Sequence, residues 1–149
     1  MHAMTKTLAP VRSSVPDVTE LSALTASAVM TSPVLTVGAA DLVTSVWNLM
    51  QRTHVGHVVV VAGDRCLGIV DVRDLWAAWA FDLERPARRS VVHLVTATPC
   101  VSCDTPLPLL CRALVGSRQG AVLVLDDAGE LRGIVTSSDV VRALARVAV

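Results

Sequence analysis

The chain has 149 residues, which is enough for one compact domain or for two closely fused half-units. Thirteen Lys and Arg residues balance thirteen Asp and Glu residues, so the molecule has no general electrostatic attraction to nucleic acid. Hydrophobic residues make up 52% of the chain and charged residues only 17%, which excludes intrinsic disorder. Because so apolar a chain has little polar surface, we expect part of that surface to be buried against a partner subunit.

The sequence also bears on the compartment of the protein. No run reaches the roughly 18 uninterrupted apolar residues of a membrane span. The first six residues lack the apolar segment of an export signal. Four cysteines in such a chain are expected to be reduced thiols. We therefore expect a soluble, cytoplasmic, oligomeric protein with no membrane partner.

Residues 1–23 form an N-terminal extension that precedes the patterned part of the chain. We expect its first dozen residues to be loosely held and residues 16–21 to begin a short helix. Residues 34–37, which are rich in β-branched side chains and follow a proline, predict a strand.

Helical periodicity follows this strand. Asp41 is placed to cap a helix, and the apolar face of that helix comprises Val43, Val46, Trp47 and Met50. Residues 57–61, like residues 121–125 later in the chain, form a continuous aliphatic run that fits a strand buried on both faces. Residues 66–70 are predicted to return as its partner strand. A second helix is predicted from Asp74 to about Leu83.

The same order recurs after a basic linker at residues 84–90. Thr105 is expected to cap a helix with Pro106 in its first turn, and the apolar face comprises Leu109, Leu110, Ala113 and Leu114. Residues 121–125 and 131–135 are the next two predicted strands, and a last helix runs from Asp139 to about Val147.

An internal repeat underlies this order. Residues 68–74 read Gly-Ile-Val-Asp-Val-Arg-Asp, and residues 133–139 read Gly-Ile-Val-Thr-Ser-Ser-Asp. Thr-Ser-Pro-Val at residues 31–34 likewise corresponds to Ala-Thr-Pro-Cys at residues 97–100. The sequence therefore predicts an α+β fold in which a β-α-β-β-α unit occurs twice, at residues 24–83 and 91–149.

These residues resemble the tandem cystathionine-β-synthase (CBS) domain pair, or Bateman module, over about residues 26–147. The resemblance rests on the two Gly-Ile-Val-x-x-x-Asp segments, on Val-Met-Thr-Ser-Pro at residues 29–33, and on the repeated element order. It implies two sheets packed about a pseudo-twofold axis, and two such pairs commonly associate into a flat disc. It also implies adenosine-containing ligands in clefts between the copies and a regulated partner protein.

The resemblance further implies the residues of the two clefts. The aspartate that ends each motif would accept both hydroxyls of a ribose, because a carboxylate offers only acceptors to two donors. The helix N-terminus beside it favours anions. One cleft would comprise Thr136, Ser138 and Asp139 with Val55, His57 and Asp41, and the other Asp74 with Thr105, Gln119 and Ala121.

Some positions depart from the family pattern. Asp71 stands where the family usually has Ser or Thr, and Asp41 is a second acidic substitution. A desolvated carboxylate would repel a phosphate strongly. Val59 and Leu123 replace the usual proline of the central strand. We therefore expect a lightly charged adenosine compound, or no nucleotide, rather than ATP, unless Arg73 and the linker arginines offset the acidic charge.

Each candidate residue also has a purely structural interpretation. Asp74 and Asp139 would serve equally well as helix caps. His57, and its neighbour His54, would be partly buried structural residues if neither lies against an adenine.

A metal or redox site is the alternative for the cysteines. Cys100 and Cys103 would be its centre, with His93, Cys111 and Cys66 as further ligands. Residues three apart on an extended segment point to opposite faces, and a second Cys-x-x-Cys pair is absent. Buried, unreactive thiols are therefore the preferred interpretation.

Aromatic residues concentrate on the helix that follows Asp74. Leu75 and Ala78 can already face the sheet, so Trp76, Trp79 and Phe81 are predicted to form a subunit interface. Arg85, Arg88 and Arg89 are expected to belong to a solvated linker.

The sequence contains none of the common catalytic motifs, such as a glycine-rich phosphate loop, His-Glu-x-x-His or Gly-x-Ser-x-Gly. The leading hypothesis is a stand-alone regulatory CBS pair. It would form a homodimer, need no cofactor or metal, bind AMP, ADP, ATP or S-adenosylmethionine, and act on a partner protein. The alternative is a ligand-free module for protein interaction.

Overall fold

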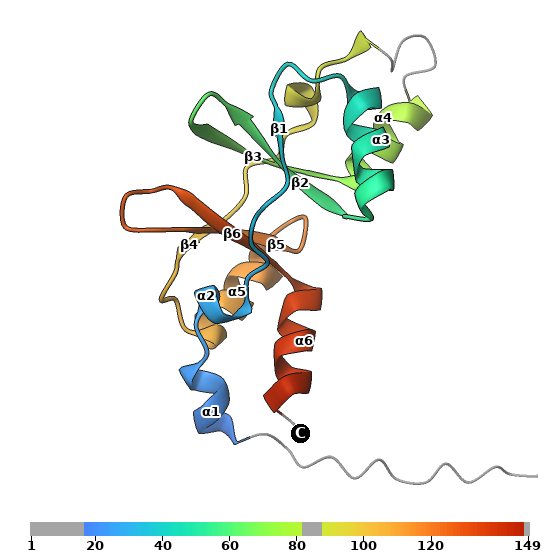
Figure 1. The fold of residues 1–149 in the computed structure, drawn as a ribbon. Coiled ribbons are helices and arrows are strands. Elements are labelled where there is room, and N and C mark those ends of the chain that lie inside the picture. Colours follow the sequence, from blue (N-terminus) through green and yellow to red (C-terminus); the bar gives the residue numbers. More distant parts are fainter. Residues whose placement is uncertain (1–16, 82–87, 148–149) are drawn as a thin grey trace, which may run out of the picture.

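Two three-stranded sheets of the same topology form the centre of the molecule (Figure 1). The computed structural model describes residues 17–81 and 88–147. In each sheet the first strand is parallel to the second, and the third is antiparallel to the second. The strands are β1 (Thr36–Gly38), β2 (His57–Ala62) and β3 (Arg65–Asp71), then β4 (Cys100–Ser102), β5 (Ala121–Leu125) and β6 (Leu131–Thr136).

Helices flank both sheets, which confirms the predicted α+β class. As expected, Leu75 and Ala78 are the buried residues of the helix after β3. None of the helices in the two described stretches is long and apolar enough to cross a membrane. They are α1 (Val18–Ala23), α2 (Ala26–Val29), α3 (Val43–Thr53), α4 (Val72–Phe81), the 3-10 helix η2 (Val91–Leu94), α5 (Leu107–Gly116) and α6 (Ser137–Val147).

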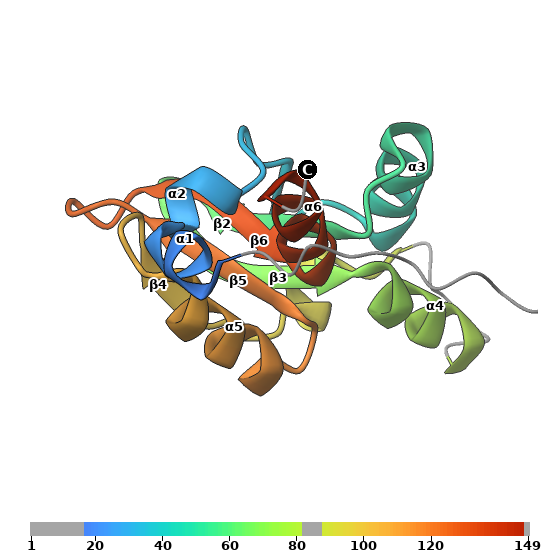
Figure 2. The same ribbon diagram turned by 90° about the horizontal axis from the view of Figure 1, so that it is seen from below.

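The aliphatic strands are buried on both faces, as their composition predicts. In the first sheet, Val58, Val60 and Val70 belong to a core with the helices. The alternate residues Val59 and Ile69 face the other sheet, because successive side chains of a strand point to opposite faces. The second sheet repeats this arrangement, and Figure 2 shows it in front of the first.

In each copy, the residues that precede the first strand pack against the other copy. We call these two stretches, before β1 and before β4, the exchanged segments. Helix α2 lies in the core of the second copy, and η2 lies in the core of the first. Thr31 pairs with Ile134 through backbone hydrogen bonds of 2.9 and 3.1 Å, and Thr96 pairs with Ile69 through bonds of 3.1 and 3.3 Å. The linker at residues 84–90 divides the two repeats in the sequence, but each packed half of the structure contains residues from both repeats.

The glycine of each Gly-Ile-Val segment permits this crossing. A Cβ at Gly68 would overlap with the carbonyl oxygen of Thr96, and a Cβ at Gly133 would overlap with the side chain of Met30. Gly68 also has a φ of 145°, which L-residues rarely adopt. The motif glycines are thus required because a segment of the other copy passes close to the strand at these positions.

Two predicted helix caps are wrong. The residue before α3 is Leu42, which gives no side-chain cap, and the carboxylate of Asp41 accepts the N–H of Gly38 instead. Helix α5 begins after Pro106, so Thr105 lies one position too early to cap it. The apolar face of α5 also differs, because Leu109 is exposed and Leu107 is buried in its place.

Helices α4 and α6 begin two residues earlier than predicted, so Asp74 and Asp139 are third in their helices rather than N-caps. From there, Asp139 accepts the N–H of Thr136 at 2.9 Å, and Asp74 accepts that of Asp71 at 3.3 Å. Asp71, which precedes α4, accepts the N–H of Arg73 at 2.7 Å in return. This reciprocal arrangement resembles a capping box.

The buried carboxylate of Asp71 is held by a cation. Arg73 approaches it at 2.7 Å, and the imidazole of His57 lies 3.4 Å away. Burial alone would raise the pKa of Asp71, but the hydrogen bonds from Arg73 and the nearby His57 outweigh this effect and lower it. The acidic substitution at residue 71 is therefore compensated within its own helix turn.

Gly68→Ala is expected to lower the free energy of unfolding by more than about 2 kcal/mol, because the added Cβ strains the backbone and displaces Thr96. Gly116→Ala is the control, since it adds a methyl group to open space at the end of α5. Denaturant unfolding measures both. Equal stability of the two variants would contradict the close approach described here.

Asp71→Asn is expected to lower the free energy of unfolding by about 1–3 kcal/mol at pH 7, because the charged hydrogen bonds with Arg73 are lost. The folded-state pKa of Asp71 lies below its unfolded value of about 3.9, so this stabilisation is present above that value and is lost as pH falls. The difference in the free energy of unfolding between the variant and the wild type should therefore disappear as the pH falls from 5 to about 2. Denaturant unfolding measures this, and the exposed control Asp64→Asn should show little change. A difference in stability between Asp71→Asn and the wild type that persists in acid would argue against the ion pair.

Candidate functional site

An open cavity of about 690 Å³ lies where the N-terminus of α6 meets the loops before β2 and β5. This volume falls within the range of small-molecule sites. Both copies contribute to its wall. The lining comprises Thr31, residues 33–35, 54–57, 118–120 and 136–139, together with Arg73, Ile134 and Arg142.

Among the lining residues of the cavity, the acidic one is Asp139, which is 5% exposed. One carboxylate oxygen accepts from the hydroxyl of Thr31 at 2.8 Å and from Arg142 at 2.9 Å. The other accepts from the N–H and the hydroxyl of Thr136, at 2.9 and 3.1 Å. These donors fill its lone-pair sites, so a ribose would have to replace Thr31 or Arg142.

His57 links the two copies at the edge of the cavity. Its Nε2 lies 3.1 Å from the carbonyl oxygen of Gln119 and 3.4 Å from the carboxylate of Asp71. The ring is therefore engaged with protein groups on one side while the residue still lines the cavity. His54 also lines the cavity, from an exposed left-handed position at the end of α3.

Basic residues outnumber acidic ones around the cavity. Arg142 is paired with Asp139, and Arg73 is paired with the buried Asp71. Arg118 is exposed and forms no ion pair with any part of the chain that the structure describes. Together with the N-terminus of the three-turn helix α6, this excess favours an anionic ligand.

The expected repulsion of phosphate does not hold for this cavity. Asp41 is not part of its lining, because its carboxylate binds the N–H of Gly38 beside β1. Asp71 is buried and neutralised by Arg73. Neither of the two carboxylates on which the expected repulsion rested therefore faces this cavity as a free charge.

The structure brings most of the expected residues together, though not all. Thr105 contacts the hydroxyl of Ser102 at the start of α5, and it does not reach Asp74. Ala121 is buried in β5. Asp74 binds the amide of Gln119 at 2.8 Å, as paired in the sequence analysis. The expected residues that line the cavity are Val55, His57, Gln119, Thr136, Ser138 and Asp139.

Sequence reasoning missed Thr31, Arg118 and Arg142 as members of the site. Arg142 lies three positions after Asp139, a spacing that places both on one helix face and could have been noticed. Arg118 occupies the position in the second copy that His54 occupies in the first. Thr31 gave no such signal, because it reaches Asp139 only through the exchanged segment.

The cysteines do not gather into a site. Cys100 is exposed and the other three cysteines are only half-buried, which corrects the expectation of buried thiols. Cys103 follows β4, with its Sγ near the carbonyl oxygen of Leu125. Partial burial raises the pKa of the Cys66 thiol, which lowers the fraction of reactive thiolate. Within residues 17–81 and 88–147, no three His, Cys, Asp or Glu side chains lie close enough to hold a metal ion.

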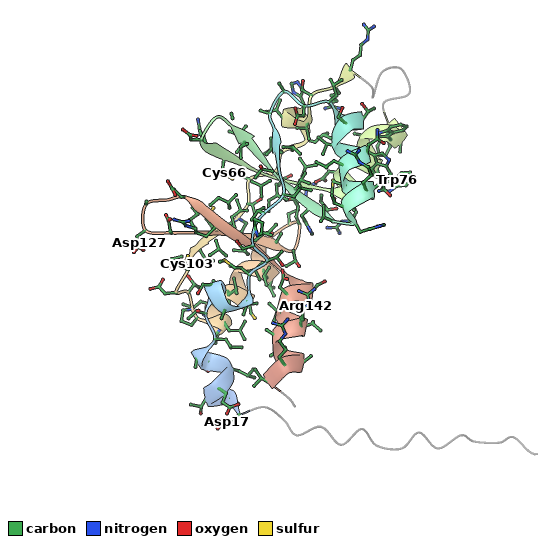
Figure 3. The ribbon with its side chains drawn as sticks, viewed as in Figure 1. Asp17, Cys66, Trp76, Cys103, Asp127 and Arg142 are labelled. Atoms are coloured by element: carbon green, nitrogen blue, oxygen red, sulfur yellow. The ribbon has the colours of Figure 1, made fainter. Side chains whose placement is uncertain are left out.

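The aromatic residues of α4 lie on the surface. Trp76, Trp79 and Phe81 are 60%, 43% and 88% exposed. The ring of Trp47 on α3 meets that of Trp76 edge to face, with centroids 5.1 Å apart. Figure 3 shows Trp76 at the outer end of the first copy, far from Arg142 on α6. Arg85 lies outside the described residues, and Arg89 is half-buried, with its carbonyl bound to Val43.

Comparison with known structures shows the same fold elsewhere. A hemolysin-like CBS-domain protein of Oenococcus oeni is 19% identical, with a TM-score of 0.74 over 85% of this chain and 93% of that one. The CBS domain of a bacterial CNNM/CorC family Mg²⁺ transporter, solved in complex with ATP, is 20% identical with a TM-score of 0.74, over 85% and 91%. A CBS-domain-containing protein from Agrobacterium tumefaciens is 28% identical with a TM-score of 0.67, over 74% and 88%.

The sequence gives the same result. No curated protein matches the chain. The model of the CBS domain, however, matches two segments, residues 26–75 and 89–146, which together span most of the chain. These segments contain the two Gly-Ile-Val-x-x-x-Asp motifs, and the solved structures are tandem CBS-domain proteins. The chain belongs to the CBS-domain family, as a tandem pair.

Proposed function

We propose that this CBS pair is a small cytoplasmic regulator that binds an adenosine-type ligand in the cavity at Asp139. The observation that carries the proposal is the position of Asp139, a buried carboxylate that already accepts from two hydroxyls, those of Thr31 and Thr136. A ribose hydroxyl offers the same donor chemistry. The related transporter domain solved in complex with ATP supports a ligand of this class.

The charges of the cavity favour phosphorylated members of the class. Arg118 has no ionic partner among the described residues, and the N-terminus of α6 adds partial positive charge. S-adenosylmethionine carries a sulfonium cation, which these groups would repel. We therefore rank AMP, ADP and ATP above S-adenosylmethionine.

Regulation would follow from the position of the cavity between the copies. The lining includes residues of the exchanged segment and of both loops that precede the central strands. A ligand that binds one relative arrangement of these segments more tightly than another shifts the population toward it. A partner protein that contacts the surface would read this shift, and the chain itself would not be catalytic.

We propose that a second copy of the chain covers the aromatic face of α4. The exposed residues of this helix after Asp74 are all apolar: Trp76, Ala77, Trp79, Ala80 and Phe81. A solvated helix face usually carries charged residues, whereas buried aromatics are typical of the centre of an interface. The described exposed face of α6, by contrast, includes Arg142 and Arg146.

Asp139→Ala is expected to weaken the binding of ATP at least tenfold, because the carboxylate that orients the ribose is lost. Isothermal titration of AMP, ADP and ATP measures this loss. The matched control is Asp127→Ala in the exposed turn between β5 and β6, which should bind like the wild type (Figure 3).

Arg118→Ala serves as a second variant in case Asp139→Ala impairs folding. It should weaken ATP binding more than adenosine binding, because only ATP carries phosphates. If the wild type gave no heat with any of these nucleotides at millimolar concentration, the ligand-free interaction module would be the better account.

Trp76→Ser combined with Trp79→Ser is expected to convert a dimer into a monomer, because the apolar area of the interface is removed. Light scattering coupled to size-exclusion chromatography measures the mass. The control Val18→Ser changes an exposed apolar residue on α1, away from this face. A wild type that is already monomeric at high concentration would refute the proposed interface.

A further inference from the structure

The two clefts expected in a CBS pair are not equivalent in this chain. The aspartates that end the two motifs, Asp74 and Asp139, correspond to each other in the repeat. Asp139 lines the open cavity, whereas Asp74 is not part of its lining. Something therefore distinguishes the two halves of a nearly symmetric fold.

The difference lies in the residue that faces each aspartate from the other copy. Gln119 reaches Asp74 from the loop before β5, with its Nε2 2.8 Å from the carboxylate and 3.4 Å from the carbonyl oxygen of Ile69. The corresponding residue in the loop before β2 is Val55, because Gly56 and Gly120 align in the repeat. The side chain of valine cannot form a hydrogen bond to Asp139, and the open cavity lies in that half of the pair.

The orientation of the Gln119 amide is fixed by its partners. Both groups that it meets, the carboxylate of Asp74 and the carbonyl of Ile69, accept hydrogen bonds, so the NH₂ group must point toward them. Its Oε1 is then buried without any partner among the described residues. A buried acceptor without a donor is unfavourable. The hydrogen bond to Asp74 thus holds the Gln119 amide in place, although its Oε1 is left without a donor.

We infer that Gln119 is an intramolecular latch that occupies the ligand position in front of Asp74, so that each chain offers one adenosine site instead of two. The amide NH₂ stands where a ribose hydroxyl would donate to Asp74. Gln119 is 6% exposed, binds Asp74 and also lines the open cavity, whereas Asp74 does not line it. This inference rests on the proposed function, since it assigns which half of the pair binds the ligand.

A reciprocal exchange of the two residues tests the latch. Gln119→Val copies the open half into the closed one, and Val55→Gln copies the latch into the open half. The probe is adenosine, because it carries the ribose hydroxyls but no phosphate. Isothermal titration gives the number of sites per chain, and circular dichroism confirms that each variant is folded.

The wild type should bind one adenosine per chain and Gln119→Val should bind two. Val55→Gln should weaken binding at least tenfold, and this variant keeps the inference testable if Gln119→Val does not fold. The control Gln51→Val changes an exposed glutamine on α3 and should bind like the wild type.

The outcomes separate the latch from the proposed function. Two sites in the wild type, or one site in both the wild type and Gln119→Val, would overturn the latch and leave the proposed function intact. No site in the wild type but one in Gln119→Val would support the latch and overturn the site at Asp139. Absence of binding in both proteins would overturn both.

Discussion

The exchange of segments between the two copies is the constraint on which the rest of the structure depends. Each sheet is only three strands wide, and its edge is completed by a short bridge to a segment that belongs, in sequence, to the other copy. Three strands with a covered face are about the minimum that independent stability needs. Because the exchange buries both faces of both sheets, the halves stabilise each other and the cavity arises at their junction.

This junction explains the chemistry of the site. Asp139 is fixed by donors from three places in the chain: the exchanged segment, the residue before α6 and the next turn of that helix. Its carboxylate is therefore oriented before any ligand arrives. The corresponding carboxylate of Asp74 has different partners, because the N–H of Asp71 and the amide of Gln119 both donate to its Oδ2. Near-identical local structure thus yields two different environments.

The sequence predicted those parts of the fold that depend on local pattern. The aliphatic strands and the repeated order followed from periodicity and from the duplicated motif, and the family identified Asp139. The cap of α3 was mispredicted because Asp41 accepts the N–H of Gly38 before the helix, a choice of partner that helical periodicity does not reveal. Contacts such as that of Gln119 with Asp74 join residues 45 positions apart, so only the tertiary structure reveals them.

All three tryptophans of the chain lie around one small hollow, between α3 and α4. The indole fluorescence of the protein therefore originates entirely from one end of the molecule, and the second copy contributes no signal of its own. An emission spectrum will respond to events at that end, such as a change in how wet the rings are. Rearrangements around α5 and α6 will not change the tryptophan emission unless they are transmitted through the sheets.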